Sequence, residues 1–205
     1  MSGSVVIPAV ISIILGYFIG SVNTSIVVSK FYKIDIRQQG SGNAGLTNTM
    51  RVLGKKAAAI VLIGDVLKGI VSCLIGLLLA GGLGALAGGL GSIIGHNWPV
   101  YFKFRGGRGV LTSIAVVAFI DWRIMLILLG IFLIMLAITR YVSLGSITAA
   151  VFFPVISLLI GKGPEFLVFS VVTALMIIFR HTGNIKRLLN GKEARFNWNK
   201  SRSIN

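Results

Sequence analysis

Long apolar runs constrain this chain more than any other feature. A membrane-crossing helix needs about 20 apolar residues, and four strong runs approach or exceed that length: 5–28, 57–79, 122–139 and 144–160. A fifth run, 165–179, is shorter but nearly continuous. With 55% hydrophobic residues, only 12% charged residues and a mean hydropathy of +0.92, the chain is typical of polytopic helical membrane proteins and not of soluble domains.

The region 81–120 is less regular, because it holds two short apolar pieces, 84–94 and 110–120, separated by polar sequence. We interpret the two pieces as short helices. The sequence therefore predicts an all-α protein with seven transmembrane helices, two of them short, in a single domain over residues 1–205. If the two short pieces form one re-entrant hairpin instead, five spans result, and the N-terminus and the C-terminus stay on the same sides of the membrane as with seven spans.

The distribution of the 20 Lys and Arg residues sets the orientation, since cations in short loops stay cytoplasmic. With the N-terminus outside, all of them except Lys68, Arg123 and Lys162 fall on the inner side. We therefore expect a cytoplasmic C-terminus, with the polar, basic tail 194–205 either disordered or lying on the headgroups. The net charge of +15 is then mainly topological and attracts anionic lipids; we expect no nucleic-acid partner.

Three polar, glycine-marked stretches, 40–56, 95–113 and 180–193, fall on the cytoplasmic side in this topology. Glycines let backbone N–H groups turn toward an anion, hydroxyls and amides add donors, and arginine supplies a planar fork for phosphate oxygens. The second stretch also opens a helix at residue 110, whose N-terminus favours anions. The candidate ligand-binding residues are Ser41, Asn43, Gly45, Thr47, Asn48, Arg51, His96, Gly106, Gly107, Arg108, Gly109, His181 and Asn184.

Several of these residues also have a purely structural interpretation. His96 precedes Trp98 and Pro99 and suits a polar helix end, while His181 suits the C-terminus of a helix, where a cation is favoured. Asp65 and Lys68 share one face of an apolar run, and such buried charges must pair. They could lock helices together, orient a loop above them, or relay a proton.

Metal, cofactor and nucleophile chemistry find no support in the sequence. The acids, the histidines and the single cysteine, Cys73, show no ligand-like spacing, so we expect no metal and no cofactor. A G-x-S-x-G elbow and an H-x-x-x-x-D pair are both missing from the sequence. Conventional hydrolase chemistry is therefore disfavoured.

Four motifs in order make the chain resemble the bacterial acyl-phosphate:glycerol-3-phosphate acyltransferases, integral-membrane enzymes. They are S-G-N-x-G-x-T-N at residues 41–48 with Arg51 following, D-x-x-K-G at 65–69, G-H-x-x-P-x-F/Y-x-x-F-x-G-G at 95–107, and H-x-x-N-I-x-R-L-x-x-G-x-E at 181–193. The resemblance covers essentially the whole chain. One departure is Arg108, where similar family members commonly have Lys, so a rigid fork replaces a point charge.

The resemblance implies transfer of an acyl chain from acyl phosphate to the 1-hydroxyl of glycerol 3-phosphate, at the cytoplasmic face of a bacterial cell (inner) membrane. It implies that Ser41, Arg51, Arg108, His181 and Asn184 hold glycerol 3-phosphate; Ser41, Arg51, His181 and Asn184 form the predicted catalytic set. Either His181 or a substrate phosphate takes the hydroxyl proton. A transient contact with the soluble enzyme that makes acyl phosphate is a further expectation. A small organic-phosphate transporter and a lipid-binding scaffold are the alternative functions.

Overall fold

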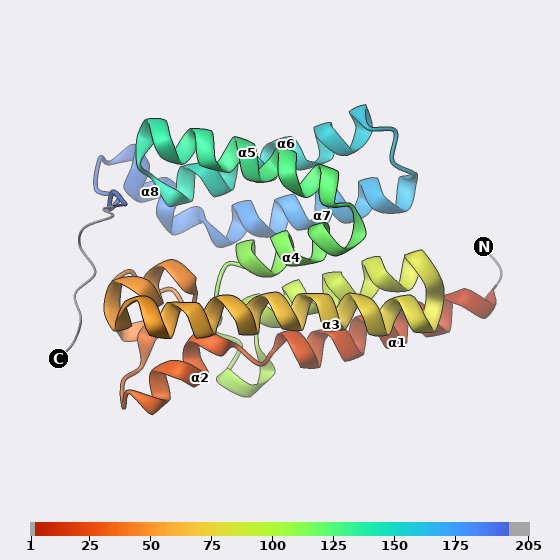
Figure 1. Cartoon of the computed structure of the whole chain (residues 1–205), viewed down its shortest axis with the longest axis horizontal. Coiled ribbons are helices and arrows are strands. Elements are labelled where there is room, and N and C mark those ends of the chain that lie inside the picture. Colours follow the sequence, from red (N-terminus) through yellow and green to blue (C-terminus); the bar gives the residue numbers. More distant parts are fainter. Residues whose placement is uncertain (1–2, 197–205) are drawn as a thin grey trace. The chain divides into compact units, whose positions relative to one another are not determined.

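The computed structural model describes residues 3–196, which form helices and turns without any strand, as the all-α prediction requires (Figure 1). The described residues belong to two compact units, 3–120 and 121–196. The single-domain interpretation of residues 1–205 stays a prediction. Of the predicted tail 194–205, residues 197–205 lie outside the described part of the chain.

The first unit begins with a helix that breaks where the sequence predicts continuity. The apolar run 5–28 is divided, because Ser21–Asn23 interrupt the helix and the Asn23 side chain caps the next one by accepting a hydrogen bond from the Ile26 N–H at 3.1 Å. Hydropathy cannot show such a break. The helices and 3₁₀ turns of this unit are α1 (Gly3–Gly20), α2 (Thr24–Phe31), η1 (Ile36–Gln38), α3 (Leu46–Asn97), η2 (Val100–Phe102) and α4 (Val110–Ile120).

Helix α3 is broken at two points along its length. Gly54 and Gly81 have φ of 85° and 60°, a left-handed conformation that only glycine adopts without strain. Together with Ala80, Gly81 reverses the chain, as the yellow end of α3 shows in Figure 1. The predicted runs 57–79 and 84–94 therefore lie in two separate straight pieces. These pieces are antiparallel, since a Cβ on Gly76 would meet the backbone of Gly84.

Glycines let the backbone of the returning piece of α3 touch its neighbours on two sides. A Cβ on Gly88 would strike the Ser72 carbonyl of the first piece, while a Cβ on Gly91 would strike the Ile13 carbonyl of α1. In lipid, apolar side chains gain nothing by leaving the solvent, so close backbone packing through small residues holds helices together. The glycine-rich region 81–95 is thus the packing centre of this unit.

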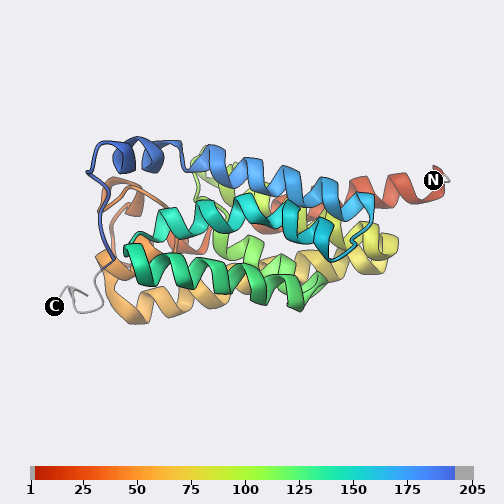
Figure 2. The ribbon, with the colours of Figure 1, turned by 90° about the horizontal axis from the view of Figure 1, so that it is seen from above.

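The second unit is built from α5 (Trp122–Thr139), α6 (Val142–Leu159), α7 (Pro164–Arg180) and α8 (Thr182–Leu189). The first three match the predicted runs within about two residues at each end and lie side by side in both views (Figures 1 and 2). Asp121 caps α5 and pairs with Lys162 at 2.6 Å, tying the start of α5 to the α6–α7 turn. Hydrogen bonds from Arg123 and Lys162 hold the pKa of Asp121 below its usual range.

The long described helices expose mostly apolar side chains on their outer faces, as a lipid environment requires. In α5, for example, only Ile124 is buried, while Ile138 is 74% exposed. By length and composition four helical stretches are able to cross a membrane, or five if α7 and α8 form one span bent by 56°. One of these four stretches, Leu46–Phe102, contains the chain reversal at Gly81 and therefore holds two antiparallel pieces. The seven-span count and the orientation stay predictions.

Replacing Gly88 by alanine should destabilise the first unit, because the new Cβ overlaps the backbone of Ser72 and the two pieces of α3 must separate. Overpacking of this kind costs roughly 1–3 kcal/mol. Gly82→Ala is the matched control in the same helix: outside its own turn of helix, no heavy atom of the described residues lies within 4 Å of its Cβ, so it should be neutral or slightly stabilising. Thermal unfolding in detergent measures both, and equal melting temperatures would contradict this packing.

Candidate active site

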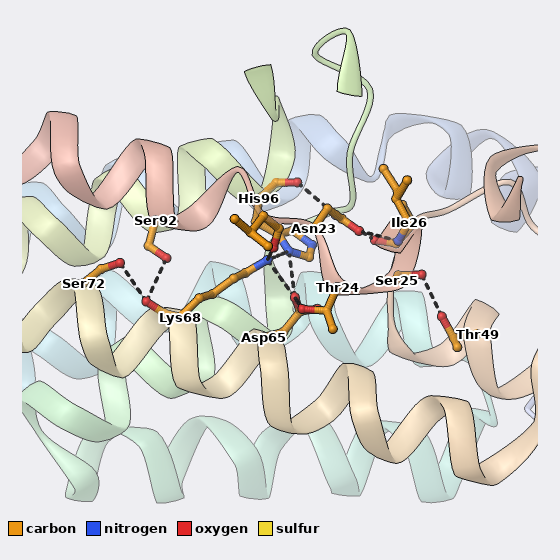
Figure 3. A network of polar contacts seen from close by, with 12 residues as sticks. Asn23, Thr24, Ser25, Ile26, Thr49, Asp65, Lys68, Ser72, Ser92 and His96 are labelled. Atoms are coloured by element: carbon orange, nitrogen blue, oxygen red, sulfur yellow. Dashed lines mark hydrogen bonds and ion pairs between the residues drawn. The ribbon is translucent and has the colours of Figure 1, made fainter. Parts of the chain in front are cut away.

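The first two polar stretches meet at the break between α1 and α2. The fully buried Asn23 amide donates two long hydrogen bonds, to the Ala44 carbonyl at 3.4 Å and to the His96 carbonyl at 3.5 Å (Figure 3). The Gly107 N–H also donates to the His96 carbonyl, at 3.0 Å. A Cβ on Gly107 would lie 2.5 Å from the Ala44 oxygen, so the two glycine turns are in direct contact.

Asn48 builds the turn of the first stretch. Its side-chain amide donates to the carbonyls of Gln39 and Asn43 at 2.9 and 3.0 Å, and its Oδ1 accepts from the Ser41 N–H at 2.9 Å. Gly40 and Gly42 supply the left-handed backbone that the turn needs, with φ of 61° and 71°. The Asn48 amide is therefore occupied in shaping the loop that presents Ser41 and Asn43.

Arg51 lies one turn further along α3 and is half-buried. Within residues 3–196 its guanidinium forms no hydrogen bond or ion pair, unlike Arg37, which is held by Asp35 at 2.9 Å. Within the described residues, the side-chain polar groups of Ser41, Asn43 and Thr47 likewise form no hydrogen bond. A partly desolvated, unpaired arginine beside a donor-rich turn favours binding of a phosphate.

The second stretch forms a turn that leads into α4, which begins at Val110 as the sequence predicts. Gly109 has φ of 76°, and a Cβ there would lie 2.8 Å from the Asn97 side-chain oxygen, so glycine is needed for both conformation and space. Arg108 stands half-buried in this turn. The N–H groups of the first turn of α4 add the donors and the positive dipole end that anions favour.

The third stretch lies in the second unit, where α7 passes into α8. His181 Nδ1 is 2.8 Å from the Ile177 carbonyl, which is an acceptor only. Nδ1 must therefore carry the proton, and in the neutral ring Nε2 carries the lone pair. The ring of His181 is thus anchored to the last turn of α7 through Nδ1, and in the neutral ring Nε2 is the nitrogen able to accept a hydrogen bond.

Glu193 holds Asn184, the other candidate site residue of the third stretch. Its carboxylate accepts from Asn184 Nδ2 and from the Ser143 hydroxyl, both at 2.6 Å, and from Arg187 Nε at 2.8 Å. Burial raises the pKa of Glu193, but these three hydrogen bonds outweigh it and hold that pKa below its usual range. Glu193 therefore fixes the Asn184 amide and joins α8 to the start of α6, a role that sequence reasoning did not assign.

Sequence reasoning also missed Asn23. The signal was present, since Ser21, Asn23, Thr24 and Ser25 stand together inside the run 5–28. Ser25 bonds the Thr49 hydroxyl at 2.7 Å, and Thr24 bonds Asp65 at 3.2 Å. Among the described residues, no group of three acids, histidines or cysteines is placed to hold a metal ion.

A family model for glycerol-3-phosphate acyltransferases matches residues 10–191. The chain belongs to the glycerol-3-phosphate acyltransferase family. It is 47% identical to a glycerol-3-phosphate acyltransferase of Thermoanaerobacter pseudethanolicus over 91% of this chain and 95% of the relative. It is 40% identical to that of Clostridioides difficile, over 90% and 93%.

The fold of this acyltransferase is similar to that of a solved integral membrane relative, PlsY. The structure of PlsY in its glycerol 3-phosphate form matches with a TM-score of 0.87 and 38% identity, covering 92% of this chain and 96% of the other. Its lysophosphatidic acid form matches with a TM-score of 0.84 and 37% identity, covering 92% and 95%. The protein is accordingly an integral membrane enzyme of phospholipid synthesis, which favours the acyltransferase over the transporter and scaffold alternatives.

The Glu193 cluster gives the acyltransferase a pH-dependent stability. Because the folded pKa of Glu193 lies below its unfolded value, about 4.3, the cluster stabilises the protein fully above that pH and the stabilisation is lost as pH falls through the folded pKa. Glu193→Gln should lower the melting temperature at pH 7 and flatten its decrease between pH 5 and about pH 3.

Glu165→Gln is the control for this change, since Glu165 is exposed at the start of α7. Melting curves in detergent across the pH range measure all three proteins. An unchanged acid profile in the Glu193 variant would contradict this role for its carboxylate.

Proposed function

We propose that this enzyme transfers a fatty acyl group from acyl phosphate to the 1-hydroxyl of glycerol 3-phosphate, releasing lysophosphatidic acid and phosphate. The observation that carries the proposal is the direct contact between two turns suited to anions, the Arg51 turn and the Gly106–Gly109 turn. Two such turns side by side suit a reaction in which both substrates bear phosphate. The glycerol 3-phosphate and lysophosphatidic acid forms of PlsY support the same substrate and product.

The chemistry needs positioning more than it needs a nucleophilic side chain. The substrate hydroxyl oxygen bonds to the acyl carbon, the bond from that carbon to the phosphate oxygen breaks, and phosphate leaves with its electron pair. Phosphate is a good leaving group, so no acyl-enzyme is required. Each substrate carries up to about −2, and holding the two together supplies roughly 7–11 kcal/mol of the barrier.

We assign the phosphate groups to the residues of the first unit. Arg51, the Ser41 hydroxyl, Asn43 and Thr47 offer donors to one phosphate. Gly45, whose N–H donates to the Asn43 carbonyl, and Asn48, which accepts the Ser41 N–H, act by shaping the turn. Arg108 and the N–H groups at the start of α4 offer a second set of donors. Gly106 and Gly107, whose N–H groups donate to the Asn97 and His96 carbonyls, shape this turn together with Gly109. His96 supports this second turn by accepting the Gly107 N–H at its carbonyl.

We assign the hydroxyl of glycerol 3-phosphate to the third stretch. His181 Nε2, which carries the lone pair, accepts the hydroxyl hydrogen bond, and the Asn184 amide, fixed by Glu193, binds the same substrate. The proton leaves to Nε2 or to a substrate phosphate. These groups act at the cytoplasmic face of a bacterial inner membrane, where the soluble enzyme that makes acyl phosphate delivers the donor.

The donor is tested with purified enzyme, labelled glycerol 3-phosphate and either acyl phosphate or acyl-CoA at equal concentration. Lysophosphatidic acid should form from acyl phosphate with one phosphate released per product, and at least about 100-fold more slowly from acyl-CoA, which carries its phosphates far from the acyl carbon. Equal rates from acyl-CoA would contradict the proposed donor.

The role of Arg51 is tested in the same assay. Arg51→Ala removes two or more charge-assisted hydrogen bonds to a phosphate, so kcat/KM should fall roughly 100-fold or more. Lys55→Ala is the matched control, because Lys55 is exposed one turn further along α3. Wild-type kcat/KM in the folded Arg51 variant would remove that residue from the site.

A further inference from the structure

A buried ionic network of Asp65, Lys68 and His96 lies against the turn of the second stretch, and Figure 3 shows these three side chains pointing toward one another. Lys68 Nζ is 2.7 Å from Asp65 Oδ1 and 2.8 Å from His96 Nδ1. Asp65 is fully buried, and Lys68 and His96 are 6% and 3% exposed. Charged groups at such depth are costly and are retained mainly for function.

The network fixes which nitrogen of His96 carries the proton. An ammonium group only donates, so the short contact with Lys68 requires His96 Nδ1 to accept. The distance from His96 Nδ1 to Asp65 Oδ1, 3.6 Å, is too long for a competing hydrogen bond. The ring proton of His96 therefore sits on Nε2.

Because His96 contacts the Gly106–Gly109 turn, fixing the His96 ring also restricts the position of that turn. Its carbonyl accepts the Gly107 N–H at 3.0 Å, and a Cβ on Gly107 would collide with its Nε2, so the ring lies against the Gly107 backbone. Lys68 also donates to the Val22 carbonyl at 3.3 Å, next to Asn23, which reaches the carbonyls of both Ala44 and His96. One buried ammonium thus supports both anion-binding turns.

We propose that Asp65 and Lys68 are positioning residues that hold the Gly106–Gly109 turn, through the His96 ring, in the geometry that binds a substrate phosphate. The inference rests on the proposed function of that turn. It assigns to the D-x-x-K-G motif a role in substrate affinity. A pair that merely locks the two pieces of α3 together would affect stability and leave the affinity of folded protein unchanged.

The test separates these roles by comparing KM, kcat and melting temperature in folded protein. Asp65→Leu with Lys68→Leu replaces the pair by apolar side chains, which commonly preserves folding. We expect KM for glycerol 3-phosphate or for acyl phosphate to rise about tenfold or more, with kcat changed less than KM. Ser72→Ala is the control, because within residues 3–196 the Ser72 hydroxyl bonds only the Lys68 backbone carbonyl, at 2.7 Å, on the same helix.

A second pair of variants keeps the inference falsifiable if the double variant does not fold. In His96→Asn the amide oxygen takes the place of Nδ1 and still accepts from Lys68, whereas His96→Leu loses that bond. We expect the KM of the Asn variant to lie nearer the wild-type value. Equal KM values in the Asn and Leu variants, or a wild-type KM in the folded double variant, would overturn the inference.

An error in the proposed function would show in the wild-type enzyme and not in the comparison of variants. If the wild-type enzyme makes no product from acyl phosphate, the donor assignment is wrong. Binding of glycerol 3-phosphate and of inorganic phosphate, measured calorimetrically without donor, then tests the positioning role. Weaker binding of either anion in the Asp65/Lys68 double variant than in Ser72→Ala would support it, and equal binding of both would refute it.

Discussion

The contact between Lys68 and His96 supports the arrangement of the first unit. A buried ammonium needs a carboxylate and further acceptors, and it finds them in Asp65, in the His96 ring and in the Val22 carbonyl where α1 breaks from α2. Satisfying this one charge brings three separate segments together. The two glycine turns that follow those segments consequently touch, which is the condition for placing two phosphates side by side.

Close helix packing makes this burial feasible. Glycines between Gly76 and Gly95 let the two pieces of α3 and helix α1 approach until their backbones touch, and Asp65 and Lys68 are buried in the same unit. The second unit orients its polar groups differently, through the carboxylate of Glu193 and a backbone carbonyl. The two histidines accordingly differ in tautomer: Nδ1 of His96 accepts, whereas Nδ1 of His181 donates.

Much of this structure follows from the sequence, and the remainder has physical causes. Apolar length predicts α5, α6 and α7 closely, and glycine spacing predicts a helix beginning at residue 110. Hydropathy averages over short polar groups, however, so it misses the break at Asn23. Composition also cannot show that the Asn48 amide bonds the backbone of its own loop, or that Glu193 holds Asn184, because such pairings depend on distances between segments.

The tautomer of His96 tests the central claim most directly, because the contact with Lys68 requires an unprotonated Nδ1. Nitrogen-15 NMR of enzyme labelled at histidine, with His181→Asn to assign the two rings, reports which ring nitrogens carry protons. We predict an unprotonated Nδ1 and a protonated Nε2 for His96 in the wild type, and a mixture of tautomers in Lys68→Met. A protonated Nδ1 in the wild type would contradict the account.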